Sequence, residues 1–307
     1  MRVAVLLNKD AGAIQQSGDH AVCETVLSAF AQHGILAEVK MLSGSELSSA
    51  ARSAADKALQ KDIDAVVAAG GDGTIGTVAS ALVDTRIPLG IIPLGTLNHL
   101  ARDLGIPLHL QDAVNVIAES NARPVDAAAV NGRIFLNNSS IGVYPFMVLE
   151  RERRRRHGLA KWAAMIWATF KVMRLFPMRR FHVFAQGRSE ICRTPCLFVG
   201  NNRYRLDLLG LGRRERLDGG KLWLYIAKQH TRLSLIWFTF RALLGLTEPG
   251  KDLVFFETSA AEITSKRKRL SVATDGEVHW MAPPLHYRTR PGALRIYRPM
   301  TESSRSG

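Results

Sequence analysis

Residues 65–83 read AVVAAGGDGTIGTVASALV: an apolar run, a glycine-rich turn and a segment with helical spacing. Ala65–Ala69 is continuously apolar, as expected of a strand buried on both faces of a parallel sheet. The three glycines of the turn, GGDGT at 70–74, let the backbone bend sharply and approach a ligand closely. The turn leads into a helix predicted over Ile75–Val83, and the unpaired N–H groups at a helix start suit phosphate oxygens. The stretch therefore predicts a strand, a phosphate-binding turn and a helix in succession.

The GGDGT turn fits neither of the two commonest nucleotide-binding fingerprints. Its glycine spacing differs from that of the dinucleotide-binding motif, and no Gly-Lys-Ser/Thr follows as in the Walker loop. Asp72 lies inside the turn, where its negative charge would repel a phosphate unless a metal ion lay between them. Asp72 therefore indicates magnesium, and a plain tight turn without a ligand is the alternative interpretation.

Outward from this turn, the first half of the chain alternates between strands and helices. Strands are predicted over Val3–Leu7, Leu36–Leu42, Ala65–Ala69 and Ile87–Ile92, and helices over Asp19–Gln32, Glu46–Gln60, Ile75–Val83 and Leu110–Ala118. Apolar strands separated by helices favour a parallel sheet covered on both faces. The loop PLGTLNH at 93–99 should lie at the same sheet edge as GGDGT, where ligands bind in such sheets. Thr96 and Asn98 would offer a hydroxyl and an amide to a nucleotide there, although both residue types also cap helices.

The second half of the chain has many short strands and few helices. Asn131-Gly132 accepts the positive φ angles of a tight turn and predicts a hairpin between Pro124–Val130 and Arg133–Ile141. Further strands are predicted over Phe181–Ala185, Ile191–Val199, Lys221–Ala227, Leu253–Phe256, Ala261–Ser265, Leu270–Ala273 and Leu294–Tyr297. This pattern favours an antiparallel sandwich or barrel. We expect a nucleotide-binding α/β domain over 1–127, a β-rich domain over 128–300 and a disordered tail over 301–307.

The charge of the chain is divided unevenly between the two halves. The 307 residues carry a net charge of +14, but residues 1–128 hold 9 Lys+Arg and 14 Asp+Glu, which leaves +19 on the remainder. A basic half suggests an anionic partner, either a nucleic acid or a lipid surface, and a charge that serves only solubility is the alternative. No helix-turn-helix, zinc or RNA-stacking signature accompanies the charge, so nucleic acid is the weakest of these interpretations.

Two segments of the second half combine basic residues with tryptophans. They are 151–176, which begins with a run of arginines, and 233–246. Neither has the roughly 20 uninterrupted apolar residues that a spanning helix needs. They fit helices that lie in a membrane interface, and a core helix with a solvated basic rim is the alternative. The three cysteines, Cys23, Cys192 and Cys196, form no disulfide framework, and with no signal-peptide pattern at the N-terminus they favour the cytoplasm.

Five motifs of this sequence occur in the same order in a known family. They are GGDGT at 70–74, PLGTLNHLARDLGIP at 93–107, NNSSIG at 137–142, LDGG at 217–220 and TDGE at 274–277. In this order and at these intervals they resemble the diacylglycerol-kinase catalytic-domain superfamily, which includes soluble bacterial lipid kinases and the sphingosine and ceramide kinases. GGDGT alone is shared with NAD kinases and phosphofructokinases, whereas the later motifs point to the lipid kinases. A bacterial-type member is the nearest likeness.

The resemblance implies a nucleotide-binding α/β domain and a β-rich lipid-substrate domain, with ATP and the lipid headgroup meeting in a cleft. It implies nucleotide contacts from Asn8, Ser43, Gly70, Gly71, Asp72, Gly73, Thr74, Thr96 and Asn98. Glu277 or Asp275 would be the general base on the lipid hydroxyl, with Glu277 the usual assignment. Mg²⁺ would be held at a structural site by Asp218 with carbonyls near Glu215 and Gly220, and at a catalytic site within an acidic network that includes Asp72 and Asp126.

The resemblance also implies a setting for the reaction. The expected acceptor is a lipid with a free hydroxyl, diacylglycerol being favoured, and the basic second domain is expected to bind an anionic membrane surface. We therefore expect a cytoplasmic protein that associates peripherally with the inner face of the membrane, and a homodimer is compatible with this. The alternatives are a kinase of a soluble hydroxyl substrate and a lipid-binding protein that has lost catalysis. The best argument for the last is His99, which stands where the family often has Asp.

Overall fold

The computed structural model describes residues 1–12, 19–142, 179–204, 214, 216–227 and 253–300. The chain forms two compact units. Unit 1 comprises Met1–Ala127 and the segment that begins at Pro291, and unit 2 comprises Ala128–Arg290. The domain expected over 128–300 thus runs past the end of unit 2, because the last strand of the chain returns to the sheet of unit 1.

Unit 1 is built on a parallel sheet. Its strands are β1 (Arg2–Asn8), β2 (Leu36–Leu42), β3 (Ala65–Gly70), β4 (Pro88–Pro93) and the C-terminal part of β16 (Leu285–Tyr297), in the order β2-β1-β3-β4-β16. Every neighbouring pair runs parallel. All residues of β3 are buried, which agrees with the continuous apolar run in its sequence. The parallel α/β fold predicted for this half is confirmed.

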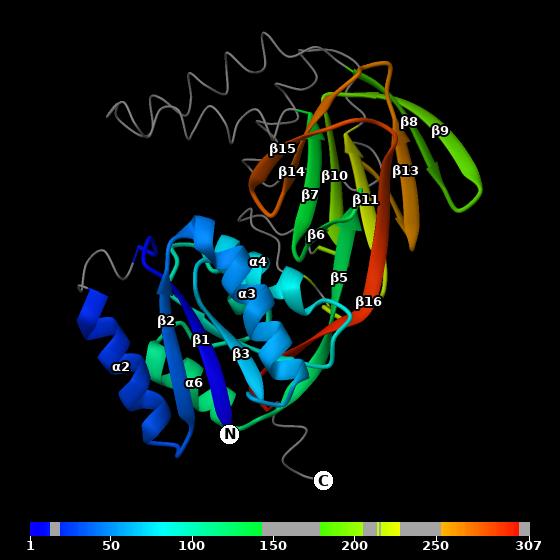
Figure 1. The fold of residues 1–307 in the computed structure, drawn as a ribbon. Coiled ribbons are helices and arrows are strands. Elements are labelled where there is room, and N and C mark those ends of the chain that lie inside the picture. Colours follow the sequence, from blue (N-terminus) through cyan, green and yellow to red (C-terminus); the bar gives the residue numbers. More distant parts are fainter. Residues whose placement is uncertain (13–18, 143–178, 205–213, 215, 228–252, 301–307) are drawn as a thin grey trace, which may run out of the picture. The chain divides into compact units, whose positions relative to one another are not determined.

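Helices cover both faces of this sheet (Figure 1). They are α2 (Asp19–Ala31), α3 (Gly44–Leu59), α4 (Asp72–Leu82), α5 (His99–Asp103) and α6 (Leu110–Ala118). Helix α3 packs against α4 on one face, and α2 and α6 lie together on the other. There Val26 and Phe30 of α2 meet Val114 of α6 over Val5 and Leu7 of β1. Because the strands are parallel, β1, β3 and β4 all deliver their carboxyl ends to one edge of the sheet.

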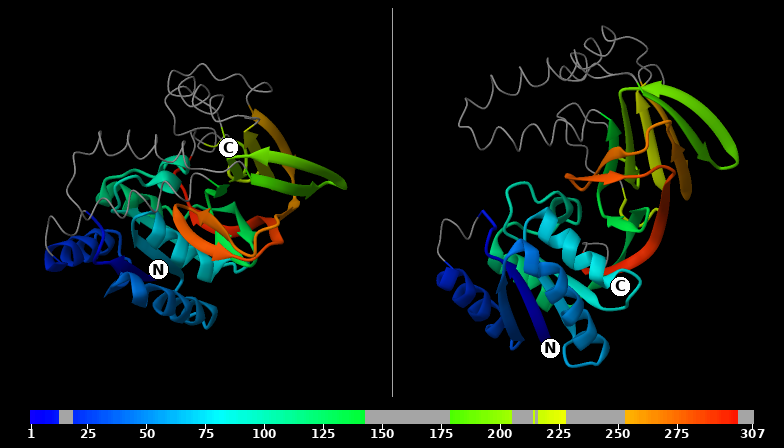
Figure 2. Two further views of the ribbon diagram at one scale, coloured as in Figure 1. Left: turned by 90° about the horizontal axis from the view of Figure 1, so that it is seen from above. Right: turned by 45° about the horizontal axis from the view of Figure 1, so that its top comes forward.

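Unit 2 is a sandwich of two sheets. One has the antiparallel strands β7 (Asn138–Gly142), β10 (Cys196–Asn201), β11 (Leu222–Ala227), β12 (Leu253–Thr258), β14 (Leu270–Thr274) and β15 (Glu277–Met281), in the order β12-β11-β10-β7-β14-β15. The other pairs β13 (Ala260–Thr264) with the first part of β16 and with β8 (Arg179–Ala185), whose outer neighbour is β9 (Arg188–Thr194). The β8–β9 hairpin lies at the outer edge of this second sheet (Figure 2). The two sheets enclose one apolar core that includes Phe181, Ile263, Tyr287, Leu197, Leu224 and Val272.

A short hairpin opens unit 2, as the sequence predicts. β5 (Ala122–Val130) and β6 (Arg133–Phe135) are antiparallel, with Val130 opposite Arg133. Asn131 and Gly132 have φ angles of 47° and 81°, which a two-residue hairpin turn requires. The unit boundaries at 127/128 and 290/291 fall inside β5 and β16, so both strands are shared between the units.

Prolines and glycines account for two of the differences between the predicted and observed strands. The strand predicted over Ile191–Val199 is two strands, β9 and β10, because Pro195 separates them. β16 begins at Leu285 rather than Leu294, since Pro291-Gly292 within it reads as a break. The strand predicted over Arg133–Ile141 likewise divides into β6 and β7, and β15 has no counterpart among the predicted strands.

Among the described residues, no helix is both long and apolar enough to cross a membrane. The two segments predicted to lie in a membrane interface, 151–176 and 233–246, fall outside the described residues, as does the predicted tail 301–307.

Candidate functional site

The GGDGT turn joins β3 to α4 in unit 1. Gly70 ends β3, Gly71 is the N-cap of α4 and Asp72 is its first residue. A Cβ at Gly70 would lie 2.4 Å from Thr74 Oγ1, so no side chain fits there. The same Thr74 hydroxyl accepts a hydrogen bond of 2.9 Å from Nδ2 of Asn8, at the end of β1. Three residues with predicted nucleotide contacts, Asn8, Gly70 and Thr74, are therefore neighbours at one strand edge.

The loop after β4 touches the GGDGT turn through bare backbone. A Cβ at Gly95 would lie 2.5 Å from Cα of Gly71. Such a distance leaves no room for a side chain at Gly95. A Cβ at Gly71 would lie 3.3 Å from Gly95 Cα, so the two backbones are in close contact. The N–H of Leu94 also donates to the carbonyl of Gly70 at 2.9 Å. The two glycine-containing loops that the sequence places at one sheet edge are thus in direct contact.

Asn98 holds the shape of this second loop. Its backbone is left-handed, with φ 49°, and its side chain is 4% exposed. Its Oδ1 accepts from the N–H of Gly95 at 3.1 Å, and its Nδ2 donates to the Gly95 carbonyl at 2.8 Å. The Asn98 amide is therefore engaged within the loop, and its predicted contact with a nucleotide stays a prediction. Thr96, between these two residues, is exposed.

Asp72 and Ser43 both start helices. The Asp72 carboxylate accepts from the backbone N–H groups of His99 at 3.1 Å and Leu100 at 3.2 Å, which caps α5. The N–H of Ser43 donates to Glu46 Oε2 at 2.8 Å, and its hydroxyl lies 2.5 Å from the same oxygen at the start of α3. These hydrogen bonds lower the pKa of Glu46. The predicted nucleotide contacts of Asp72 and Ser43 also stay predictions.

The TDGE motif of unit 2 forms the turn between β14 and β15. Asp275 and Gly276 have φ angles of 48° and 88°, and Thr274 faces Glu277 across the hairpin. The Asp275 carboxylate accepts three backbone N–H groups: Leu136 at 2.7 Å, Asn137 at 2.8 Å and Asn138 at 3.0 Å. Burial raises the pKa of Asp275, and the three N–H bonds act in the opposite direction. Two of the family-like motifs, NNSSIG and TDGE, are thereby joined through one carboxylate.

A buried arginine completes this junction. Arg214 is 7% exposed, and its Nη1 donates to the Leu136 carbonyl at 2.6 Å. Its Nη2 donates to Oδ1 of Asn137 at 2.9 Å. The Arg214 charge also acts on Asp275. No sequence motif marks Arg214, and both Leu136 and Asn137 lie more than seventy positions away from it in the chain.

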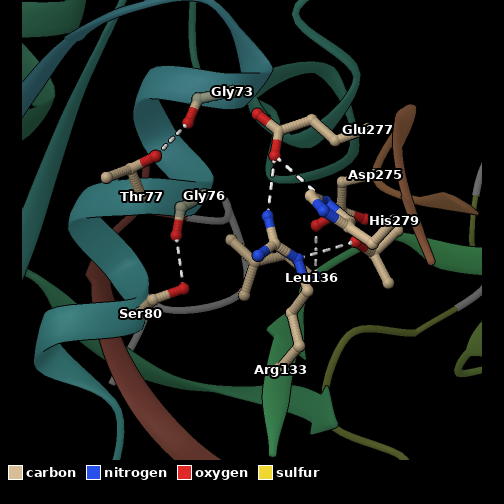
Figure 3. Close-up of polar contacts among 10 residues, drawn as sticks. Gly73, Gly76, Thr77, Ser80, Arg133, Leu136, Asp275, Glu277 and His279 are labelled. Carbon is tan, nitrogen blue, oxygen red and sulfur yellow. Dashed lines mark hydrogen bonds and ion pairs between the residues drawn. The ribbon is translucent and has the colours of Figure 1, made fainter. Parts of the chain in front are cut away.

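Glu277 is exposed and sits between two basic side chains (Figure 3). Its Oε2 lies 2.8 Å from Nη2 of Arg133 and 3.5 Å from Nε2 of His279. Arg133 Nε also donates to the Thr274 hydroxyl at 3.3 Å, which fixes the guanidinium against the turn. Burial, and then the Arg133 charge, lower the pKa of His279. Of the two predicted bases, Glu277 thus presents an exposed and oriented carboxylate, whereas Asp275 is occupied by backbone N–H groups.

Helix α4 carries a row of small residues next to the GGDGT turn. The hydroxyls of Thr77 and Ser80 donate to the carbonyls of Gly73 and Gly76, at 2.9 Å and 2.8 Å (Figure 3). Hydroxyls bonded back to the preceding turn are satisfied within their own helix. This face of α4 therefore offers little side-chain bulk beside the turn.

The predicted magnesium ligands Asp126 and Asp218 each have a protein contact of their own. Asp126 is 2% exposed and accepts from the N–H of Gly292 at 2.8 Å. Asp218 pairs with Nε of Arg216 at 3.0 Å, Gly220 has φ 67°, and Glu215 lies outside the described residues. Within the described ranges, no three His, Cys, Asp or Glu side chains are grouped so that they could hold a metal ion. The described carboxylates therefore do not form a metal cage by themselves, and both magnesium sites stay predictions.

Known proteins resemble this chain in sequence and in fold. The diacylglycerol kinase catalytic domain model matches residues 2–130. A diacylglycerol kinase from Bacillus subtilis is 44% identical over 241 residues, which cover 75% of this chain and 76% of that protein. A probable lipid kinase YegS-like from Pectobacterium atrosepticum is 28% identical, with 75% of this chain and 81% of the relative covered.

Two further matches extend this likeness. The chain spans 55% of the length of the uncharacterized protein sll0036 from Synechocystis, to which it is 27% identical over 78% of its own length. The crystal structure of a diacylglycerol kinase from Bacillus anthracis has the same fold, with a TM-score of 0.68, 21% identity and 97% of each chain covered. The contact between the GGDGT and PLGTLNH loops, the TDGE junction and these relatives agree: the chain belongs to the diacylglycerol kinase catalytic-domain family of lipid kinases.

Proposed function

We propose that this protein transfers the γ-phosphoryl group of ATP to the free hydroxyl of a lipid, and diacylglycerol is the acceptor that we favour. The observation that carries the proposal is the direct backbone contact between Gly71 and Gly95 at the start of α4. This contact gathers two glycine-containing loops and the N–H groups of a helix start at one strand edge, in a chain of a lipid-kinase family.

The phosphates of ATP would bind at the start of α4. The first N–H groups of a helix have no partner within the helix, and together with the helix dipole they favour an anion. The exposed Gly73 and Thr96 leave the turn accessible. Mg²⁺ bound to a nucleotide is held chiefly by phosphates and water, with one or two carboxylates from the protein. Asp72 is the candidate for such a carboxylate, and the ion would neutralise charge on the phosphates.

Glu277 would accept the proton of the lipid hydroxyl. The hydroxyl oxygen forms a bond to the γ-phosphorus, the bond to the bridging oxygen of ADP breaks, and the proton passes to a Glu277 carboxylate oxygen. Arg133, 2.8 Å from Glu277, would hold that carboxylate in one orientation. General-base assistance is typically worth about 10²–10⁴ in rate. Asp275 would serve by fixing the turn from which Glu277 projects.

The proposal is tested by incubating the protein with labelled ATP, Mg²⁺ and a panel of lipids in anionic vesicles. The panel holds diacylglycerol, a sphingoid base, a polyprenol and a glycolipid, because each presents a hydroxyl beside an apolar tail. We expect a phosphorylated lipid, with Glu277→Gln strongly reduced. A phosphorylated soluble compound with no lipid product would favour a soluble-substrate kinase. Retained lipid binding with no phosphorylated product would favour a protein that has lost catalysis.

The setting that we propose for this reaction is the cytoplasmic face of a membrane, where the protein would associate peripherally. A diacylglycerol-like acceptor stays in the bilayer because its tails are apolar, so the enzyme must come to it. The positive charge of the second half of the chain would favour an anionic leaflet.

A further inference from the structure

One end of unit 2 carries six exposed basic residues, which we call the basic edge. They are Arg180 on β8, Arg193 on β9, and the consecutive Lys266, Arg267, Lys268 and Arg269 between β13 and β14. Arg180 and Arg193 are direct cross-strand partners in the hairpin. Like charges placed opposite each other destabilise a hairpin. The fold gains nothing from this pair, so its presence points to a role outside the fold.

The strand register brings the loop 266–269 to the same end of the sheet. Thr264, the last residue of β13, pairs with His182 of β8. The antiparallel direction then carries the chain past the Arg180 end of β8 as it enters the loop. Arg267 acts electrostatically on Arg179, which adjoins Arg180; burial is the larger of the two effects that lower the pKa of Arg179. The six residues therefore form one cluster although they come from three segments.

Within the described ranges, no member of the basic edge has an acidic partner. The nearest acidic residues on the same strands do not pair with the basic edge. Glu262 of β13 lies 3.5 Å from Nδ1 of His286. Glu190 of β9 lies on the opposite face of the strand from Arg193, because the two residues are an odd number of positions apart. The positive charge of the basic edge is thus uncompensated on its surface.

Apolar side chains are exposed on the same outer face of β8 and β9. Phe184 is 52% exposed and Ile191 is 61% exposed. Ile191 pairs with His182 and Phe184 with Ser189, so both side chains share the face that carries Arg180 and Arg193. A surface that combines a basic cluster with isolated large apolar side chains matches the interface of a bilayer, where charges meet headgroups and apolar groups enter the acyl boundary. A nucleic acid would bind the charges but offers nothing to an exposed isoleucine.

We propose that the basic edge, together with Phe184 and Ile191, docks this protein onto an anionic lipid bilayer. Docking would depend on the charge of the lipid and would weaken with salt, since exposed charges are screened. It lies wholly within unit 2 and does not depend on chemistry at Glu277. It goes beyond the proposed kinase reaction because it names the surface through which the protein would reach its lipid.

The test is co-sedimentation of the full chain with vesicles, without ATP. The vesicles are phosphatidylcholine alone or phosphatidylcholine with phosphatidylglycerol. The test variant replaces Lys266, Arg267, Lys268 and Arg269 with glutamine, and the control variant makes the same replacement at the exposed Lys40, Arg52, Lys61 and Arg86 of unit 1. Both variants lose the same charge. Each basic residue near the surface contributes about fivefold in affinity, so the four replacements should weaken binding to anionic vesicles by up to about 600-fold.

The control variant is expected to change vesicle affinity by less than about fivefold, because its charges lie outside the basic edge. At a fixed salt concentration, the double variant Phe184→Ser, Ile191→Ser should bind anionic vesicles more weakly than the wild-type chain. Equal losses in the test and control variants would overturn the proposal, as would equal binding of the wild-type chain to both kinds of vesicle. Loss of RNA oligonucleotide binding in the test variant, with vesicle binding intact, would assign the edge to nucleic acid instead.

Activity towards a lipid dispersed in neutral detergent separates this proposal from the kinase reaction. The test variant should keep that activity while it loses vesicle binding. A wild-type chain that binds anionic vesicles but phosphorylates no lipid would leave docking intact and contradict only the reaction.

Discussion

Two candidate turns, one in each unit, are held in different ways. In unit 1, residues 70–74 and 93–98 meet through bare backbone, with Gly71 and Gly95 in contact. In unit 2, residues 274–277 and 136–138 meet through a carboxylate that accepts three N–H groups. The first junction depends on the close approach of two backbones, and the second depends on hydrogen bonds to a charged group. Substitutions should therefore act on the two turns through different physical quantities.

The largest expected effect distinguishes the role of Glu277 in catalysis from the role of Asp275 in stability, although both residues lie in one turn. Glu277→Gln removes the proposed base from an exposed position, so kcat should fall by about 10²–10⁴ with little change in stability. Asp275→Asn replaces one acceptor oxygen by an amide that faces N–H groups, and stability should fall by about 1–3 kcal/mol. Asn tolerates the left-handed backbone of this position, so the turn itself is retained. Urea unfolding and steady-state kinetics on both variants measure the two quantities. A large kcat loss confined to Asp275→Asn, with its stability unchanged, would exchange the two roles.

The next effect tests the backbone contact in unit 1. Gly95→Ala puts a Cβ 2.5 Å from Gly71 Cα and 2.7 Å from Asn98 Oδ1, so the loops must separate. Stability should fall by about 1–3 kcal/mol, with a parallel loss of ATP affinity. Gly76→Ala is the matched control: it lies within α4 and its Cβ would meet nothing within 4 Å. It should stabilise the chain by about 0.5–1 kcal/mol. Thermal unfolding measures the stability of the two variants, and titration measures their ATP affinity. A change in stability of the same sign in both variants would refute the close contact between Gly95 and Gly71.

A smaller effect concerns Ser43, whose role in nucleotide binding is untested. Its hydroxyl is engaged with Glu46 at the start of α3. Ser43→Ala should cost about 1 kcal/mol of stability through the lost cap. If Ser43 also contacts the nucleotide as predicted, ATP affinity should weaken several-fold, as measured by titration at a temperature where both proteins are folded. An unchanged affinity would limit the role of Ser43 to the start of α3.

The smallest effect is the pH dependence of His279. The pKa of folded His279 lies below the ordinary histidine value of 6.5, first because of burial and then because of the Arg133 charge. The unfolded chain therefore binds more protons than the folded one in the window below 6.5, so the stability due to neutral His279 is present above that value and is lost as pH falls. His279→Gln should flatten this part of the stability curve. Urea unfolding between about pH 5 and pH 8, a range that includes the ordinary histidine pKa, measures how the free energy of unfolding of the two proteins changes with pH. Identical slopes would show that His279 does not titrate differently on folding.

The sequence predicts unit 1 better than unit 2, and the reason is physical. Runs such as Ala65–Ala69 are apolar throughout because a parallel strand is buried on both faces. In unit 2, strands such as β8 alternate between buried and exposed residues, and Pro195 divides β9 from β10. Local pattern therefore misplaces their ends. The two glycine loops could be assigned to one edge because parallel topology alone brings them there.

Contacts in the candidate site that join distant positions could not be predicted. Arg133 and Glu277 are 144 positions apart, and Arg214 and Asn137 are 77 apart. No local pattern indicates that either arginine faces the turn. The same holds for Asp275, whose motif marks it as important but does not show that three N–H groups occupy its carboxylate. Motifs indicate which residues matter, and only the register of the strands shows what each of them contacts.

β16 has a consequence for how the protein is made. The strand joins the sheet of unit 1 through Arg295 and Ile296, beside β4, yet it follows the whole of unit 2 in the chain. During synthesis from the N-terminus, the sheet of unit 1 lacks this strand until about 160 more residues have left the ribosome. A nascent chain that stalls in between therefore carries an open sheet edge, whose unpaired N–H and C=O groups can pair with another chain.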